Sequence, residues 1–318
     1  MPRSVALAAA LLAALVLAAC GGTEASSTVA RPPLRSTAPP PAAPALAGYR
    51  VAAAGDIACP PRVRPSAIAC HERQTAALLD RIRPRLVLPL GDLQYPYGQL
   101  PDFRRVFAPS WGRWRARMRP APGNHEWFLS PATGYFDYFG ARAGPRGRGW
   151  YSYDAGGWHL VALNGNCAKV GCAVGSPQER WLRADLARHP RRCTLAYWHQ
   201  PRFSSGLHGN ADDTAPLWAD LYAAGAELVL SGHDHSYERF APQAPSGRAD
   251  KARGVVQFVA GTGGVNLYPI FRVKPNSRVR NGATFGVLEL GLRAGAYAWR
   301  FVPEAGARFT DSGSARCH

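Results

Sequence analysis

The chain has 318 residues, 47% of them hydrophobic, so it can bury a sizeable core in one large domain or two ordinary ones. Its formal charge of +17 comes from 38 Lys and Arg against 21 Asp and Glu. The charges are scattered arginines without a compact basic helix or a nucleic-acid-binding motif, which argues against nucleic acid as a specific partner. A coding bias toward arginine, or attraction of anionic substrates or an anionic surface, would explain the charge.

The first 19 residues have the pattern of an export signal. Arg3 supplies the positive start, and residues 5–16 form an apolar run too short to span a membrane comfortably. Leu17-Ala18-Ala19-Cys20 then resembles the cleavage box of bacterial lipoproteins. We expect an exported protein anchored by lipid on Cys20 to the outer side of the cytoplasmic membrane, and an ordinary cleaved signal peptide is the alternative.

Composition divides the rest of the chain into two parts. Residues 20–47 are rich in Ala, Pro, Ser and Thr without apolar periodicity, which predicts a tether. The remaining residues, 48–318, are predicted to form the folded domain.

Six cysteines remain once Cys20 is set aside, and they predict three disulfides in an oxidising compartment. Short loops favour Cys59–Cys70 and Cys167–Cys172, which leaves Cys193–Cys317. A structural zinc site is the disfavoured alternative, because the spacings are irregular and no Cys-x-x-Cys occurs.

Apolar runs of strand length alternate with helical patterns along the first part of the domain. Strands are predicted over residues 50–54, 86–90, 193–198 and 227–231, with a weaker one over 118–122. Helices are predicted over residues 71–82, 176–188 and 216–224, the second opened by a capping box of Ser176 and Glu179.

Other segments are expected to be irregular or to form further strands. Residues 127–149 are rich in aromatic residues and glycine and are expected to form a long loop. Residues 150–153 and 158–163 predict a pair of strands around a turn. Three later runs, at 255–260, 284–290 and 297–302, are expected to form a second sheet.

Polar side chains of metal-ligand type follow five of the apolar runs. They are Asp56, Asp92 with Tyr95, Asn124 with His125, His199, and His233 with His235. Each alone is better explained as a capping aspartate or a satisfied core histidine. Five in series are hard to explain as caps, because strand ends in α/β proteins meet at one edge of the sheet. Oxygen and imidazole ligands without thiolates suit iron, manganese or zinc.

These motifs occur in the order seen in one known family. Gly55-Asp56, Gly91-Asp92-x-x-Tyr95, Gly123-Asn124-His125-Glu126, His199 and Gly232-His233-x-His235 make the chain resemble a calcineurin-like metallophosphoesterase of the purple acid phosphatase branch. The resemblance covers residues 49–303. It implies an α/β fold, a four-layer α/β/β/α sandwich of two mixed β-sheets flanked by helices.

The resemblance also implies two metal ions. It assigns metal one to Asp56, Asp92, Tyr95 and His235, and metal two to Asp92, Asn124, His199 and His233. Relatives outside this branch often have a histidine where this chain has Ala58, so Tyr95 supplies the missing ligand. A phenolate suits Fe(III) at site one, with divalent iron, zinc or manganese at site two.

Four further residues receive roles by hypothesis. His125 would protonate the leaving group or stabilise charge on the phosphoryl group, or would merely orient Asn124. His208 would contact substrate or be a solvated loop histidine. Glu126 is expected to orient a neighbouring imidazole, and Arg239 to lie near the pocket or in a structural ion pair.

The function implied is an exported phosphoesterase that hydrolyses phosphate monoesters by attack of a metal-activated hydroxide. A phosphodiesterase acting on nucleotides or envelope phosphodiesters is the alternative. A binding protein with a structural or lost metal site is disfavoured, because all seven expected ligands are present. The natural substrate and the oligomeric state stay open.

Overall fold

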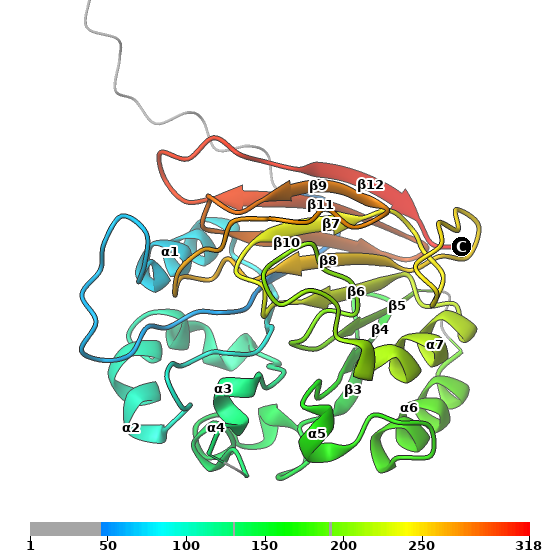
Figure 1. Cartoon of the computed structure of the whole chain (residues 1–318), viewed down its shortest axis with the longest axis horizontal. Coiled ribbons are helices and arrows are strands. Elements are labelled where there is room, and N and C mark those ends of the chain that lie inside the picture. The colour runs from blue at the N-terminus through cyan, green and yellow to red at the C-terminus, as the bar shows by residue number, and fades with distance from the viewer. Residues whose placement is uncertain (1–45, 130, 191–192) are drawn as a thin grey trace, which may run out of the picture. The chain divides into compact units, whose positions relative to one another are not determined.

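Two mixed β-sheets packed face to face form the centre of the described chain (Figure 1). The computed structural model describes residues 46–129, 131–190 and 193–318. The predicted export signal, Cys20 and nearly all of the predicted tether lie outside the described residues.

The first sheet has the strand order β12-β11-β10-β1-β2 in the described part of the chain. Strand β1 (Tyr49–Ala54) pairs in parallel with β2 (Leu86–Pro89) and antiparallel with β10 (Gly286–Arg293). Strands β11 (Ala296–Pro303) and β12 (Ser312–Arg316) extend it in antiparallel pairs. The predicted first two strands therefore lie side by side, with their carboxyl ends at the same edge.

The second sheet has the order β3-β4-β5-β6-β8-β7-β9 among the described residues. Its parallel centre consists of β4 (Trp158–Ala162), β5 (Thr194–Tyr197), β6 (Leu228–Ser231) and β8 (Val256–Ala260). Antiparallel strands close both sides: β3 (Tyr151–Ala155) on one, β7 (Tyr237–Phe240) and β9 (Ser277–Asn281) on the other.

Side chains on the central strands alternate between the two faces of each sheet, and this alternation explains how the sheets and helices form layers. Val51 and Ala53 point into the core between the sheets, where they meet Leu160 and Leu230 of the second sheet. Ala52 and its other outward neighbours pack against helices instead. Because side chains of a strand alternate between its faces, a continuous apolar run serves both layers at once.

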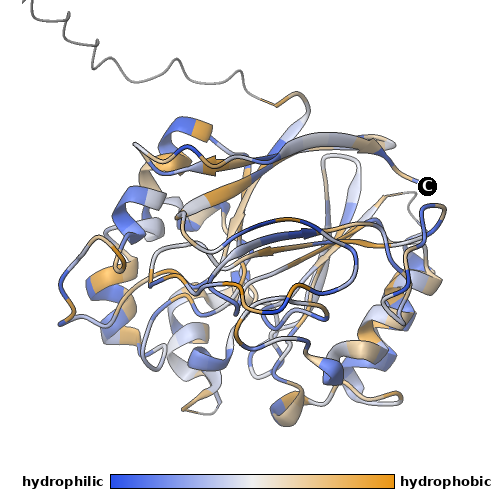
Figure 2. Cartoon of the chain, turned by 45° about the horizontal axis from the view of Figure 1, so that its top comes forward, coloured by the Kyte–Doolittle hydropathy of each residue, from blue (hydrophilic) through white to orange (hydrophobic). Residues whose placement is uncertain are grey.

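Helices cover the two outer faces. Helix α1 (Glu72–Ile82) packs on the first sheet, with α4 (Thr133–Phe139) in the same apolar cluster, and α6 (Pro177–Arg188) and α7 (Ala215–Ala223) pack on the second. Figure 2 shows that the helices carry both hydrophilic and hydrophobic residues, as expected for helices with one buried face. The predicted four-layer α/β/β/α sandwich is confirmed. Shorter helical segments are α2 (Leu100–Asp102), α3 (Asn124–Trp127) and α5 (Cys167–Val170), a π-helical turn at Phe103–Phe107, and 3₁₀ turns at Trp111–Arg117, Gly140–Ala143 and Asp212–Thr214.

Three predictions of local structure were wrong. Residues 127–149 are not a long loop, because α4 buries Tyr135, Phe136, Tyr138 and Phe139. The run at 118–122 makes only isolated bridges to β2, since its prolines cannot donate to a ladder. Strand β8 does not join β10 and β11 in a second sheet; it pairs with β6.

The predicted capping box of α6 is half formed. Ser176 accepts the backbone N–H of Glu179 at 3.3 Å, as predicted. The Glu179 carboxylate accepts the N–H of Gly175 at 2.8 Å rather than that of the cap residue. Ser176 thus satisfies one of the unpaired backbone donors at this helix start, and Glu179 fixes the residue before the cap.

The three predicted disulfides are confirmed. Cys59–Cys70 and Cys167–Cys172 close short loops, with sequence separations of 11 and 5. Cys193–Cys317 has a separation of 124 and joins the start of β5 to the residue after β12, so it links the two sheets. Within the described ranges, no helix combines the length and the apolar content needed to cross a membrane.

Candidate metal centre

The predicted ligands meet where the carboxyl ends of strands from the two sheets come together. Asp56 follows β1, Asp92 follows β2, His199 follows β5 and His233 follows β6. The backbone N–H of Gly55 donates to the carbonyl of Ala260 at 2.9 Å, which ties β1 of one sheet to β8 of the other. The centre therefore straddles both sheets.

Backbone geometry at the strand ends is unusual. Asp56, Asp92 and His233 have φ angles of 59°, 50° and 70°, a left-handed region that non-glycine residues seldom occupy. Such conformations cost on the order of 1–3 kcal/mol each and gather at functional sites. Glycines allow the close approach: a Cβ on Gly123 would collide with the Asp92 carboxylate, and one on Gly232 with that of Asp56.

Four predicted ligands of metal one converge on a single point. The Tyr95 hydroxyl lies 3.1 Å from Asp56 Oδ1, 3.2 Å from Asp92 Oδ2 and 3.0 Å from His235 Nε2. His235 Nε2 is also 3.3 Å from Asp56 Oδ1. All four side chains are buried, so the structure brings this predicted set together completely.

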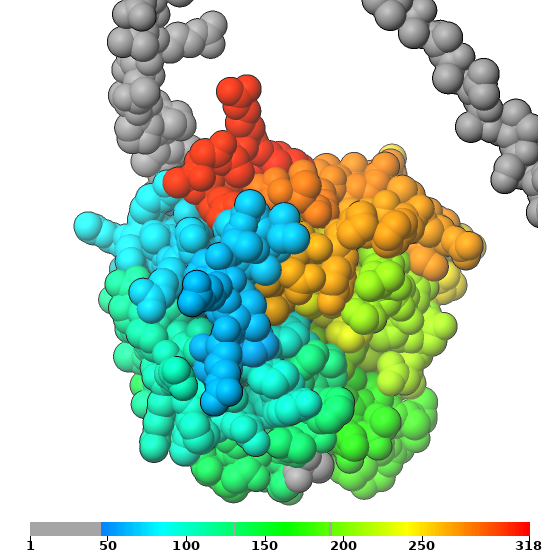
Figure 3. All heavy atoms as spheres, turned by 60° about the vertical axis from the view of Figure 1, so that its left-hand side comes forward, coloured from blue at the N-terminus to red at the C-terminus, as the bar shows by residue number. Residues whose placement is uncertain are grey.

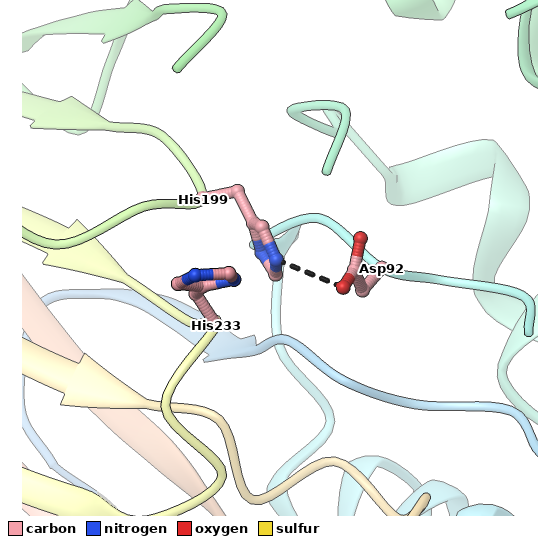
Figure 4. Close-up of side chains that lie close together, drawn as sticks. All are labelled: Asp92, His199 and His233. Carbon is pink, nitrogen blue, oxygen red and sulfur yellow. Dashed lines mark ion pairs between the residues drawn. The ribbon is translucent and has the colours of Figure 1, made fainter. Parts of the chain in front are cut away.

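The second set centres on Asp92, His199 and His233 (Figure 4). His199 Nε2 lies 3.0 Å from Asp92 Oδ2, and one ligand atom from each of the three side chains lies within 4.8 Å of the others. His199 Nδ1–H donates to the carbonyl of Leu90 at 2.8 Å, which fixes the tautomer and leaves Nε2 facing the centre. Asn124 begins α3 beside them, since the next backbone N–H, that of His125, donates to Asp92 Oδ1 at 2.8 Å.

Charges in the centre shift one another's pKa. Burial disfavours protonation of His199, but the carboxylates of Asp92 and Asp56 outweigh it and raise its pKa to about 9. Burial and the neighbouring His199 lower the pKa of His233 to about 3. Burial works against ionisation of Asp92 and Asp56, yet the imidazoles lower the pKa of both carboxyls. The centre thus holds two carboxylates whose charge needs a cationic partner.

The donor set fits metal ions. Asn124 Oδ1 and His199 Nε2 are buried and have no hydrogen-bond partner within the described residues, although such atoms are costly to leave unpaired. Carboxylate, phenol, amide and imidazole donors without thiolates are those that iron, manganese and zinc accept. Coordination to a metal ion would satisfy both of these atoms.

The two predicted catalytic histidines lie at the edge of the centre. His125 Nδ1–H donates to the carbonyl of Pro96 at 2.6 Å, while its Nε2 lies 3.8 Å from Asp92 Oδ2. His208 stacks on the His233 ring with centroids 4.2 Å apart, and its backbone N–H donates to Asp234 at 2.8 Å. Both rings therefore lie next to predicted ligands without sharing a hydrogen bond with them.

Glu126 does not orient an imidazole, so that prediction was wrong. Its carboxylate accepts the backbone N–H groups of Asp92, Leu93 and Gly123 at 2.8–2.9 Å. It thereby joins the loop after β2 to the start of α3. Burial and the negative Asp92 raise the pKa of Glu126 to about 7. Of the two alternatives for Arg239, the structural ion pair is the one that forms: Nε lies 2.6 Å from Asp311 Oδ2.

Two residues beside His235 were missed by the sequence analysis. Asn266 Oδ1 lies 3.2 Å from His235 Nδ1, and Tyr268 stacks on the same ring with centroids 4.0 Å apart. Together they hold Nε2 toward Tyr95 and Asp56. Asn266 lies in the loop after β8 but six residues beyond its end, so the search for polar residues directly after apolar runs did not find it.

A second cluster of ligand-type residues has a different character. His159 Nδ1 lies 3.0 Å from Asp154 and its Nε2 2.9 Å from Asp185, so carboxylates occupy both ring nitrogens. His189 stacks on the same ring at 4.5 Å. The cluster joins β4 to α6 as an ion-pair network.

Comparisons with known proteins agree with the geometry. The family model for the calcineurin-like phosphoesterase matches residues 49–237, more than half of the chain. Purple acid phosphatase 15 of Arabidopsis thaliana is 26% identical over 227 residues, which cover 60% of this chain and 40% of that protein. Purple acid phosphatase 22 of the same plant is 30% identical over 215 residues, covering 60% and 47%. The chain thus spans less than half the length of these two relatives.

Solved structures share the fold. The purple acid phosphatase PPD1 from yellow lupin (Lupinus luteus) superposes with a TM-score of 0.65 at 18% identity, covering 84% of this chain and 53% of that one. GAP50, described as the anchor in the inner membrane complex of Plasmodium, superposes with a TM-score of 0.62 at 14% identity, covering 86% and 90%. Since a fold can host different functions, the side chains of the site must decide the activity.

Proposed function

The chain belongs to the calcineurin-like phosphoesterase family, in its purple acid phosphatase-like branch, and from this premise we propose that it hydrolyses phosphate monoesters. The observation that carries the proposal is the convergence of Asp56, Asp92, Tyr95 and His235 on one point, with His199 and His233 beside it. Residues scattered over some 180 positions have no structural reason to share this space.

The two predicted sets of ligands share Asp92, which favours a pair of ions over two separate sites. When bound, such a pair would acidify a water molecule and offset the negative charge of the transferring phosphoryl group. Asp92 is held for this position from two sides: the N–H of His125 donates to Oδ1, and Glu126 holds its backbone.

His125 is the proposed proton donor to the leaving oxygen. Its Nδ1–H is committed to the Pro96 carbonyl, so a second proton on Nε2 would face the centre. The ring is about a third exposed, at 30%, which leaves it accessible to a substrate. His208, stacked on His233, is proposed to contact the substrate from the opposite edge.

Hydrolysis of phosphodiesters is the competing activity, since the same residues would serve both. The test compares kcat/KM of the purified, metal-loaded chain for para-nitrophenyl phosphate and bis(para-nitrophenyl) phosphate. We expect the monoester to be preferred, and a preference for the bis ester would overturn that choice. A protein that binds metal but hydrolyses neither ester would be a binding protein instead.

Fe(III) at site one is proposed from Tyr95. A phenolate is a hard anionic ligand, and the Tyr95 hydroxyl lies at the centre of the first ligand set. The oxidised iron form should show a broad visible absorption band that Tyr95→Phe abolishes, with a divalent ion of iron, zinc or manganese at site two. Full activity in a colourless, iron-free preparation would refute the ferric assignment and spare the hydrolase.

Export and anchoring by lipid on Cys20 complete the proposal. The support is the sequence Leu17-Ala18-Ala19-Cys20 and the confirmed disulfides, which suit an oxidising compartment. In cells, Cys20→Ala should abolish labelling by a radioactive fatty acid and release the protein from the membrane fraction. A membrane fraction unchanged by Cys20→Ala would contradict the anchor.

A further inference from the structure

Three large apolar side chains are exposed next to His125. Tyr97, Phe128 and Leu129 are 40%, 65% and 47% exposed, and the rings of Tyr97 and Phe128 lie 5.1 Å apart between centroids. Scattered single apolar residues on a surface are ordinary, but three that gather beside one candidate catalytic residue mark a binding surface.

Short links connect these side chains to the metal centre. Tyr97 follows Pro96, whose carbonyl accepts the His125 Nδ1–H at 2.6 Å. Phe128 is three residues beyond His125, directly after α3. The rings of Tyr95 and His125 lie 4.1 Å apart between centroids. The apolar group therefore lies on the side of the centre where the proposed proton donor is.

A hollow of about 400 Å³ adjoins the same group, with Tyr97, Leu100, Pro101 and Leu129 among its lining residues. Its acidic residues are engaged elsewhere, because Glu126 accepts backbone N–H groups and Asp137 pairs with Arg146 at 2.8 Å. The described residues that line the hollow include no lysine or arginine. An uncharged apolar group would gain from entering it, whereas a second phosphate would find no cation.

We propose that Tyr97, Phe128 and Leu129 bind the leaving group, and that the substrates are phosphate esters of apolar alkyl or aryl alcohols. This inference rests on the proposed function, because a leaving oxygen facing His125 places the rest of the alcohol over these side chains. A nucleoside diphosphate or a phosphorylated sugar would place polar or charged groups there instead.

Another exposed apolar side chain, Phe271, offers a matched control. Phe271 is 71% exposed and follows Tyr268, which stacks on His235 rather than on His125. Figure 3 shows the blue segment beside orange segments of the chain, and the backbone N–H of Cys70 donates to the carbonyl of Val265 at 3.1 Å. Val174, 77% exposed between α5 and α6, is a control from a different loop.

The experiment measures kcat/KM of the metal-loaded full chain for ethyl, butyl and octyl phosphate below the micelle concentration. These esters have alcohols of similar acidity, so the chemistry is constant while the buried area grows. We expect a rise of about tenfold from ethyl to octyl, well below the limit for six fully buried methylenes. In the double variant Tyr97→Ser/Phe128→Ser the octyl-to-ethyl ratio should fall about tenfold, and in Phe271→Ser and Val174→Ser it should stay.

Each other outcome has a distinct meaning. If no ester is hydrolysed, the proposed function fails. If ethyl phosphate is hydrolysed but the wild-type ratio is flat, only the leaving-group assignment fails. If Phe271→Ser lowers the ratio as much as the double variant, the whole rim acts as a lipid-binding surface and the assignment to the His125 side is overturned. An unchanged thermal midpoint of the double variant shows that these exposed substitutions left the fold intact.

Discussion

Glu126 accepts the backbone N–H of Asp92 at 2.9 Å, although the two residues are 34 positions apart. Both carboxylates are buried, and the same glutamate accepts the N–H of Gly123 at 2.8 Å. Burial, followed by repulsion from the negative Asp92, raises the pKa of Glu126 to about 7. The hydrogen bonds to Glu126 offset this repulsion, and they fix the loop in which Asp92 has its left-handed conformation.

Glu126→Gln should therefore weaken metal binding rather than remove a ligand. The amide retains one acceptor oxygen but cannot serve three N–H groups equally, so Asp92 should lose its fixed position. We expect metal affinity to fall about 10- to 100-fold, as for other residues that orient a ligand. Isothermal titration of the metal-free protein measures this, with Glu304→Gln as control because Glu304 pairs with His71 away from the ligands. Equal affinities of the two variants would contradict the role.

Asp92→Asn should cost more activity than Asp56→Asn. Asp92 lies near Tyr95, 3.2 Å away, and near His199, 3.0 Å away, and so belongs to both ligand sets. Asp56 lies near Tyr95 and His235, with His199 at 3.9 Å. We expect kcat/KM for para-nitrophenyl phosphate to fall at least about tenfold further in Asp92→Asn, a difference of about 1.4 kcal/mol. Equal losses would argue against a shared ligand.

His125→Gln should lower kcat most for esters of weakly acidic alcohols. An alkoxide needs a proton as it leaves, whereas para-nitrophenolate does not, so only the first loses general acid catalysis. We expect a loss of about 10²- to 10⁴-fold for ethyl phosphate and a much smaller one for para-nitrophenyl phosphate. Equal losses for both esters would show that the His125 ring only positions Asn124. The backbone N–H of His125, which donates to Asp92, is unchanged in this variant.

The ion-pair network of His159 and Asp185 should make stability depend on pH. Burial opposes the charge on His159, but Asp185 and Asp154 outweigh it and raise the pKa of His159. Burial opposes the charge on Asp185 as well, but His159 and Ser152 outweigh it and lower its pKa. The histidine contribution is lost as pH rises through its raised pKa, and the aspartate contribution as pH falls through its lowered one. Both are present between about pH 4 and pH 6.5.

Asp185→Asn should accordingly reduce the free energy of unfolding by on the order of 2–4 kcal/mol near pH 5, and by less at pH 9. Denaturant titrations at the two pH values measure the difference. Asp137→Asn is the control, because Asp137 and Arg146 form an exposed pair worth about 0–1 kcal/mol at most. A loss for Asp185→Asn that is the same at both pH values would show that packing, not charge, holds β4 to α6.

Strand ends could be predicted from this sequence because their signal is local. Asp56, Asp92 and His233 each stand two or three residues beyond the end of a buried strand, and the apolar run alone predicts where that strand stops. Which strands pair is not local. The sequences of β8 and β10 are both apolar runs of strand length, yet β8 pairs in parallel with β6 and so belongs to the other sheet.

Helix α4 was missed because glycine and aromatic residues have low helix propensity. Tertiary packing overrides that preference, since Tyr135, Phe136, Tyr138 and Phe139 are all buried. Their spacing of one, three and four residues is helical and was a usable signal. The partners of Glu126 were beyond prediction, because the donors to this buried carboxylate are backbone N–H groups of another loop.

The hydrogen bond from Gly55 to Ala260 has a consequence for folding, because it closes the seam between the two sheets at the metal centre. A partly folded chain with only one sheet assembled holds an incomplete ligand set for each metal ion and would bind an ion only weakly. Metal should therefore bind tightly only to the complete native state, and so should stabilise it after both sheets have assembled. At a free metal concentration 100 times the dissociation constant, metal binding should add about 2.7 kcal/mol to the unfolding free energy. Chelation should lower the thermal midpoint of the whole domain in a single cooperative step.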